Sequence, residues 1–127
     1  MRLVREQDGA VVADRLAVAD SFGRRFLGLM GRARLAPDEG LWLEPCDSIH
    51  MMFMRFAIDA VFLRRLAPEG PAGARGEVLE VRAGVRPWVG FARCSGAASV
   101  VELAAGSGDR LALAPGDRLR VEGEASP

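Results

Sequence analysis

The pattern of apolar and polar positions predicts short strands along most of the chain. Apolar residues at positions 3–4 and 11–13 flank an Asp-Gly pair, which is a hairpin signal. Further short apolar runs, separated by turn residues, lie at 41–43, 49–54, 59–63, 78–81, 97–103 and 118–121. No strand–helix–strand alternation runs through the chain, which disfavours a parallel α/β sheet. We therefore expect a mainly β fold, either a compact antiparallel sandwich or a small barrel.

Two segments carry helical signals instead. Apolar residues recur at helical spacing after a possible cap at Asp20 or Ser21, namely Phe22, Phe26, Leu29 and Met30. Ser107 is a possible cap for a shorter helix near the carboxyl end. The sequence predicts one clear helix over about residues 21–30 and one short helix over about residues 107–113.

The stretch from 44 to 63 concentrates most of the reactive side chains. It holds the only histidine, one of the two cysteines and three of the five methionines. Residues 49–54 are apolar on both faces of an extended chain, so we expect a strand in the interior of the sheet. A tight turn near residues 55–57 then leads into the strand over 59–63.

Composition limits the classes of partner and the compartment. The 127 residues include 17 acidic residues and 17 arginines, and there is no lysine. Acids interleave with these arginines, so we expect no nucleic-acid partner. No long apolar run is present, which argues against a membrane partner. Residues 1–6 lack the features of a signal peptide, so we expect a cytoplasmic protein. Its length predicts one domain over 1–127. A reducing cytosol would keep the two cysteines as thiols, and we expect both to be buried.

Several motifs occur together in one order. They are Arg25–Met30, Glu44–His50, Phe53–Leu63, Arg86–Trp88, Val101–Gly106 and Pro115–Asp117. This series resembles the domain of unknown function 192 family, a set of small, mainly bacterial and archaeal proteins, over about residues 14–121. The resemblance implies a compact, largely β fold with a few short helices, and it implies no activity. Met51 stands where the family usually has threonine, and Ala57 where it usually has proline.

A catalytic interpretation would use Cys46 as nucleophile and His50 as base, with Asp47 or Asp59 to orient the imidazole. Residues four apart on a strand lie about 13 Å from each other, which is too far for a hydrogen bond. We therefore expect no catalytic residues, and a small hydrolase that depends on Cys46 and His50 remains the alternative.

A metal reading would use soft ligands. On a period of two, His50, Met52 and Met54 share one strand face, and Cys46 lies just upstream. Copper(I) accepts all of these side chains. Because neighbours on one strand face project in parallel, we expect no metal and no cofactor, and a soft-metal-binding protein remains a further alternative.

The remaining polar residues favour a ligand site. An Arg55–Asp59 ion pair is expected to bridge the turn, and Glu102 lies between apolar neighbours, so it needs a partner such as Arg86 or His50. The predicted ligand-binding residues are His50, Arg55, Asp59, Arg86, Trp88 and Glu102. We expect a non-catalytic ligand-binding or accessory module, with its site around residues 46–59, that recognises a small molecule or a protein.

Overall fold

The computed structural model describes residues 1–19, 32–66 and 73–123. The helix that the sequence predicts over residues 21–30 lies outside these ranges. Among the described residues, no helix is long and apolar enough to cross a membrane.

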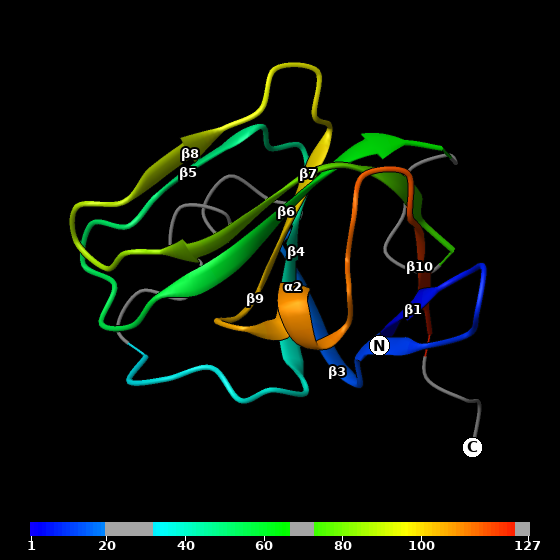
Figure 1. Cartoon of the computed structure of the whole chain (residues 1–127), viewed down its shortest axis with the longest axis horizontal. Coiled ribbons are helices and arrows are strands. Elements are labelled where there is room, and N and C mark those ends of the chain that lie inside the picture. The colour runs from blue at the N-terminus through cyan, green and yellow to red at the C-terminus, as the bar shows by residue number, and fades with distance from the viewer. Residues whose placement is uncertain (20–31, 67–72, 124–127) are drawn as a thin grey trace.

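Strands dominate the described chain, so the predicted mainly β fold is confirmed (Figure 1). In chain order they are β1 (Arg2–Arg5), β2 (Val11–Ala13), β3 (Arg15–Ala19), β4 (Glu39–Leu43), β5 (Ser48–His50), β6 (Ile58–Arg65), β7 (Arg75–Val85), β8 (Phe91–Arg93), β9 (Ser99–Ala104) and β10 (Arg118–Glu122). Eight of them form one sheet in the order β2-β1-β10-β7-β6-β9-β4-β3, and β5 and β8 form a second, two-stranded sheet.

The large sheet is mixed, which corrects the expectation of a wholly antiparallel fold. β3 and β4 run parallel, with Ala17 opposite Leu41, and the other pairs are antiparallel. A parallel pair needs a crossover of about a dozen residues or more. The connection from residue 20 to residue 38 meets that requirement, which the short apolar runs alone did not reveal.

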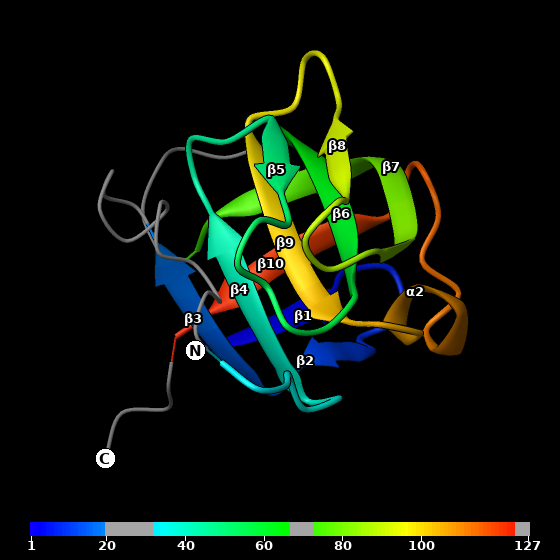
Figure 2. The same cartoon turned by 90° about the vertical axis from the view of Figure 1, so that its left-hand side faces the viewer.

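The large sheet curls without closing into a barrel. Its two end strands, β2 and β3, are consecutive in the chain, and Figure 2 shows the sheet curving around between them. A hydrogen bond from the Leu16 amide to the Met1 carbonyl (2.8 Å) is a contact across this seam. The end strands β2 and β3 do not pair with each other, so the described strands do not form the small barrel that was the alternative.

Two apolar cores lie on opposite faces of the central strands. β6 supplies both, because Val61 and Leu63 pack in the first core while Ala60 and Phe62 pack in the second. The two-stranded sheet covers the second core with Ile49 and its cross-strand partner Ala92, both buried. This second layer gives the molecule its sandwich-like character.

The predicted strand over 49–54 is wrong beyond His50. The Met54 amide donates to the Met51 carbonyl (3.0 Å) and closes a turn. Met51 and Met54 are buried, whereas Met52 and Phe53 are exposed, so the alternation of faces stops at the turn. Residues 51–54 are all apolar, and the sequence pattern therefore did not mark where the strand ends.

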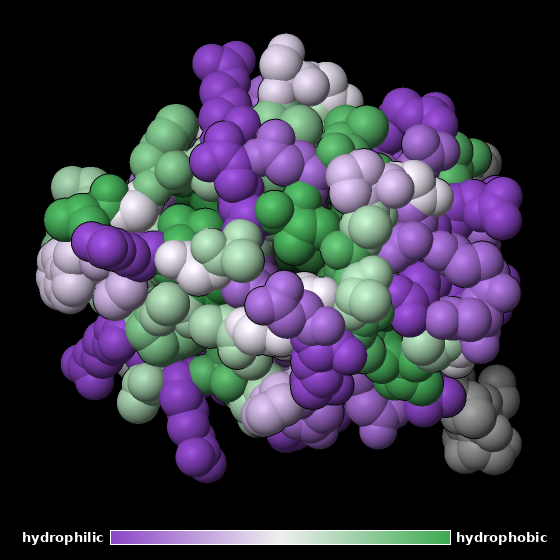
Figure 3. All heavy atoms as spheres, in the orientation of Figure 1, coloured by the Kyte–Doolittle hydropathy of each residue, from purple (hydrophilic) through white to green (hydrophobic). Residues whose placement is uncertain are grey.

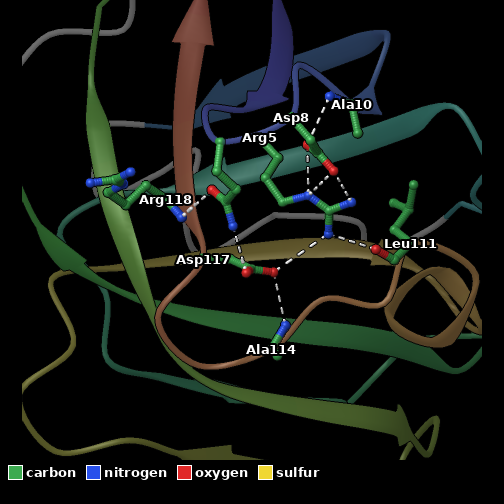
Figure 4. A network of polar contacts seen from close by, with 8 residues as sticks. Arg5, Asp8, Ala10, Leu111, Ala114, Asp117 and Arg118 are labelled. Atoms are coloured by element: carbon green, nitrogen blue, oxygen red, sulfur yellow. Dashed lines mark hydrogen bonds and ion pairs between the residues drawn. The ribbon is translucent and has the colours of Figure 1, made fainter.

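The short helix near the carboxyl end is present as α2 (Ser107–Arg110), shorter than the predicted 107–113. After it, the Asp117 carboxylate ties the loop before β10 to the β1–β2 turn (Figure 4). Its oxygens accept hydrogen bonds from the Gln7 side chain (2.7 Å) and the Ala114 amide (3.0 Å). Arg5 lies beside it and donates to the Leu111 carbonyl (2.6 Å).

Candidate functional site

Large apolar side chains are exposed where the loop after β5 meets the turn before β8. We call the group the aromatic knob; its members are Met52, Phe53, Trp88, Val89 and Phe91, each more than half exposed. The Phe53 and Trp88 rings make an edge-to-face pair with centroids 5.3 Å apart. Both loops lie at the left end of the molecule in Figure 1, where apolar and strongly polar surfaces meet in Figure 3.

Backbone hydrogen bonds hold the two loops of the knob together. The Trp88 amide donates to the Met51 carbonyl (2.8 Å), and the Met51 amide donates to the Gly90 carbonyl (2.9 Å). Buried Met51 thereby fixes the loop that carries its exposed neighbours.

The two paired rings of the knob sit on strained backbone. Phe53 has φ 65° and Trp88 has φ 68°, in the left-handed region that residues with a Cβ avoid. Each such residue costs about 1–3 kcal/mol, and such strain concentrates at functional sites. The fold therefore holds two aromatic rings in solvent on a disfavoured backbone.

A few arginines lie beside the knob. Arg55 and Arg86 are exposed, and neither has a carboxylate partner within the part of the chain that the structure describes. Two further arginines nearby are paired, Arg82 with Glu80, and Arg93 with Asp47 at 4.0 Å. An anionic group on a ligand would therefore meet uncompensated cations here.

A hollow of about 260 Å³ lies in the elbow between the end of β7 and β8. Arg82 and Arg86 line it on the β7 side, and Val89 and Phe91 line it on the β8 side, over the buried Val85 and Ala92. His50 lies across from Phe91 on the outward face of the two-stranded sheet. Of the predicted ligand residues, His50, Arg55, Arg86 and Trp88 are thus exposed on or beside the knob.

Asp59 has a structural place instead. It is wholly buried, and its carboxylate accepts hydrogen bonds from the amides of Gly84 (2.9 Å), Gly106 (3.2 Å) and Gly108 (2.8 Å). The expected Arg55–Asp59 ion pair is not formed, because these amides occupy the carboxylate while Arg55 is in solvent.

Glu102 is also separated from the predicted cluster. It pairs with Leu41 and Ala60 on neighbouring strands and faces the second core, whereas Asp59, one residue before Ala60, faces the opposite side. Only 6% of Glu102 is exposed, and burial raises the pKa of its carboxyl group to about 7. Neither Arg86 nor His50 pairs with it.

The proposed catalytic group is not assembled. The Cys46 thiol donates to the Ser48 carbonyl (3.0 Å), and Asp59 is saturated by amides. No hydrogen bond joins His50 to either of them among the described residues. Burial raises the pKa of the other thiol, Cys94, which lowers its reactivity.

The proposed soft-metal group is divided as well. Met52 is exposed while Met54 is buried, so they do not share a face with His50 as the strand pattern suggested. Within residues 1–19, 32–66 and 73–123, no three His, Cys, Asp or Glu side chains are grouped so that they could hold a metal ion.

A larger hollow, of about 630 Å³, lies at the seam of the curled sheet, and none of the predicted site residues lines it. Its charged walls are paired, Arg2 with Asp14 and Arg15 with Glu39. We place the candidate site at the knob instead.

Sequence reasoning missed most of the knob. The sequence pattern placed Phe53 inside the expected strand over 49–54, and it gave no role to Phe91. A signal was available in the apolar residues beside Pro87 and Gly90, because turn residues place their neighbours at the surface.

A family model and a curated relative place the chain among uncharacterised proteins. The chain matches the DUF192 family, described as an uncharacterized ACR, over residues 3–121. It is 31% identical over 130 residues to a UPF0127 protein of Thermococcus sibiricus (strain DSM 12597 / MM 739), covering 96% of this chain and 75% of that protein.

Two crystal structures share the fold. One, described as a putative transcription regulator from Sinorhizobium meliloti 1021, has a TM-score of 0.73 and 25% identity, over 94% of this chain and 89% of that one. The other, a protein of unknown function from Novosphingobium aromaticivorans DSM 12444, has a TM-score of 0.75 and 23% identity, over 94% and 84%. The family match spans nearly the whole chain, and the protein therefore belongs to the DUF192 family.

Proposed function

We propose that this protein is a non-catalytic binding module whose binding surface is the aromatic knob. The observation that carries the proposal is the exposed Phe53–Trp88 pair on left-handed backbone. Exposed aromatic rings beside arginines are the residue types that dominate the binding energy of protein interfaces.

The energetics favour a binding role over a packing role. Burying an aromatic side chain contributes about 1.5–3 kcal/mol, which the exposed rings forgo in the free protein. The strained backbone adds an unfavourable contribution of its own. A partner that covers the rings would recover the burial term.

The small size of the hollow favours a polypeptide as the ligand over an enclosed small molecule. Its volume of about 260 Å³ is below the usual range for drug-sized ligands, roughly 300–1,000 Å³. The knob beside it is exposed and apolar, so side chains of a partner can pack over both.

Selection of peptides from a random displayed library against the wild-type protein tests the proposal. The dissociation constant of the selected peptides is then measured by calorimetry for wild type, Phe53→Gly and Trp88→Gly. Loss of a hot-spot ring should weaken binding at least about tenfold. Glycine tolerates positive φ, so we expect both variants to fold with unchanged or slightly higher stability.

Val11→Ser is the matched control, because Val11 is an exposed apolar residue on β2, outside the knob. It should leave the affinity unchanged. Peptides that bind all four proteins equally well would contradict the proposal. Binding of a DNA duplex that survives both glycine substitutions would instead favour a role like the one named for the Sinorhizobium meliloti protein.

A further inference from the structure

We propose that the outer edge of β8 accepts an extended, acidic segment of another polypeptide as a third strand of the two-stranded sheet. This inference rests on the proposed binding role of the knob and specifies the partner and the mode of recognition. Four features support it: the direction of the β8 backbone groups, the hollow beside the strand, the charge around it, and the poor fit of other occupants.

The register fixes which way the backbone groups of β8 point. The Met51 amide donates to the Gly90 carbonyl, and the Cys94 amide donates to the Asp47 carbonyl. Met51 with Gly90, and Asp47 with Cys94, are therefore hydrogen-bonded pairs at the two ends of the sheet. In an antiparallel ladder such pairs alternate with pairs whose N–H and C=O groups point outward. Phe91 lies opposite His50, and Arg93 lies opposite Ser48. The backbone N–H and C=O groups of Phe91 and Arg93 therefore point away from β5.

The outward groups meet no third strand. The sheet has two strands in the described structure, and no backbone hydrogen bond to Phe91 or Arg93 from another segment is formed there. An exposed edge of this kind is the site at which extended peptides add to a sheet.

The hollow in the elbow lies beside that edge. Phe91 and Ala92 of β8 line it together with Arg82 and Arg86 of β7. Gly90 keeps the elbow tight, since a Cβ there would collide with the Arg86 carbonyl. An added strand would place alternate side chains over the apolar floor and against the arginines.

Charge selects the chemistry of the segment. Arg86 has no carboxylate partner among the described residues, and Arg93 holds Asp47 only at 4.0 Å. Carboxylates on the incoming strand can pair with both, so an alternation of acidic and apolar residues fits the edge.

Other occupants fit less well. A second copy of the chain would bring its own Arg86 and Arg93 against this pair of like charges. A bilayer would leave the outward N–H and C=O groups without hydrogen bonds. Nucleic acid needs a continuous basic groove, and here the cations are few.

The probe is a synthetic peptide, blocked at both ends, that alternates Glu and Val around a central Phe, with a matched peptide that has Lys for Glu. Amide exchange by NMR is measured with and without each peptide. We expect the acidic peptide to slow exchange at Phe91 and Arg93, and the basic peptide to leave it unchanged. Binding of the acidic peptide that leaves both amides unprotected would overturn strand addition.

A matched pair of variants tests the edge itself. Arg93→Pro removes the outward N–H and blocks an added strand, whereas Arg93→Ala removes the same charge and keeps the N–H. We expect the dissociation constant to rise at least about tenfold from the alanine to the proline variant. Exchange in the wild-type protein decides the matter if the proline variant does not fold.

The outcomes separate this inference from the proposed function. Equal binding by Arg93→Pro and Arg93→Ala, with binding lost in Trp88→Gly, would overturn strand addition and leave the knob as the binding surface. A second outcome is that the acidic peptide does not bind while library peptides do bind through Trp88. That result would overturn the inference of an acidic partner and leave the proposed binding role of the knob standing. A concentration-dependent dimer in sedimentation that Arg93→Pro abolishes would show that the edge pairs with a second copy, and would overturn the proposal.

Discussion

Glu102 is a carboxylic acid among apolar side chains, and its ionisation is coupled to folding. Burial raises the pKa of this group to about 7 in the folded protein, from an ordinary value near 4.5. The folded state therefore holds the proton more tightly than the unfolded state does, and stability falls as the pH rises from about 4.5 through 7. The difference between these two pKa values corresponds to a loss of roughly 3 kcal/mol in the free energy of unfolding above pH 7.

Glu102→Gln removes this ionisation and keeps the shape of the side chain. We expect the variant to be more stable than wild type by up to roughly 3 kcal/mol at pH 8, and close to wild type at pH 5. Urea denaturation at both pH values measures the difference. The same gap at pH 5 and pH 8 would show that ionisation of Glu102 is not responsible.

Asp59 differs from Glu102 because its charge is fully hydrogen-bonded. Hydrogen bonds to a charged group contribute about 1.5–3 kcal/mol each, and this carboxylate accepts three. We expect Asp59→Ala to lower the free energy of unfolding by at least roughly 3 kcal/mol, and Asp59→Asn by less, because the amide keeps one acceptor. A loss below about 1 kcal/mol in denaturant would return Asp59 to the list of ligand residues.

At the scale of elements, the Asp117 network joins segments far apart in sequence. Asp117 and Arg5 are largely buried, with 16% and 12% of their side chains exposed. Asp117→Ala should destabilise the protein by roughly 1–3 kcal/mol, because it leaves the Ala114 amide and the Gln7 side chain without their acceptor.

Asp14→Ala is the control for this prediction. Its pair with Arg2 is exposed, so we expect a loss of less than about 1 kcal/mol. Equal losses in the two variants would show that the network does not stabilise the link between the β1–β2 turn and β10.

The elements that the sequence predicted well are those whose ends carry local signals. The hairpin of β1 and β2 has its Asp-Gly turn, and Gly9 there has φ 74°. β6 contains the apolar run 60–63, and β9 contains Val100, Val101 and Leu103. The end of β5 at His50 and the short β8 had no such marker, and the parallel β3–β4 pair depends on contacts distant in sequence.

The candidate site was predictable only in part for the same physical reason. His50, Arg55, Arg86 and Trp88 stood out because polar and large residues near turns are uncommon in a core. Which face Glu102 would take, and that Asp59 would be bound by glycine amides, depended on strand register, and register is set by the whole sheet.

At the scale of the whole molecule, the two cores have different roles. The first core lies inside the curled sheet, and the second holds the two-stranded sheet that carries the knob. β6 and β9 separate the two cores, and their residues Val61 and Val101 are wholly buried in the first core. We therefore expect the knob to loosen more readily than the large sheet.

Met51→Ala tests this division, because Met51 is wholly buried under the knob and bonds to both of its loops. Deleting such a side chain costs about 2–5 kcal/mol. We expect the loss to fall mainly on the two-stranded sheet, so that hydrogen exchange accelerates at the Met51 and Cys94 amides more than at Val61 and Val101. Met52→Ala changes an exposed neighbour and should leave exchange at all four positions unaltered. A uniform acceleration across both cores in Met51→Ala would mean that the protein opens only as one unit, and that the knob is as rigid as the sheet beneath it.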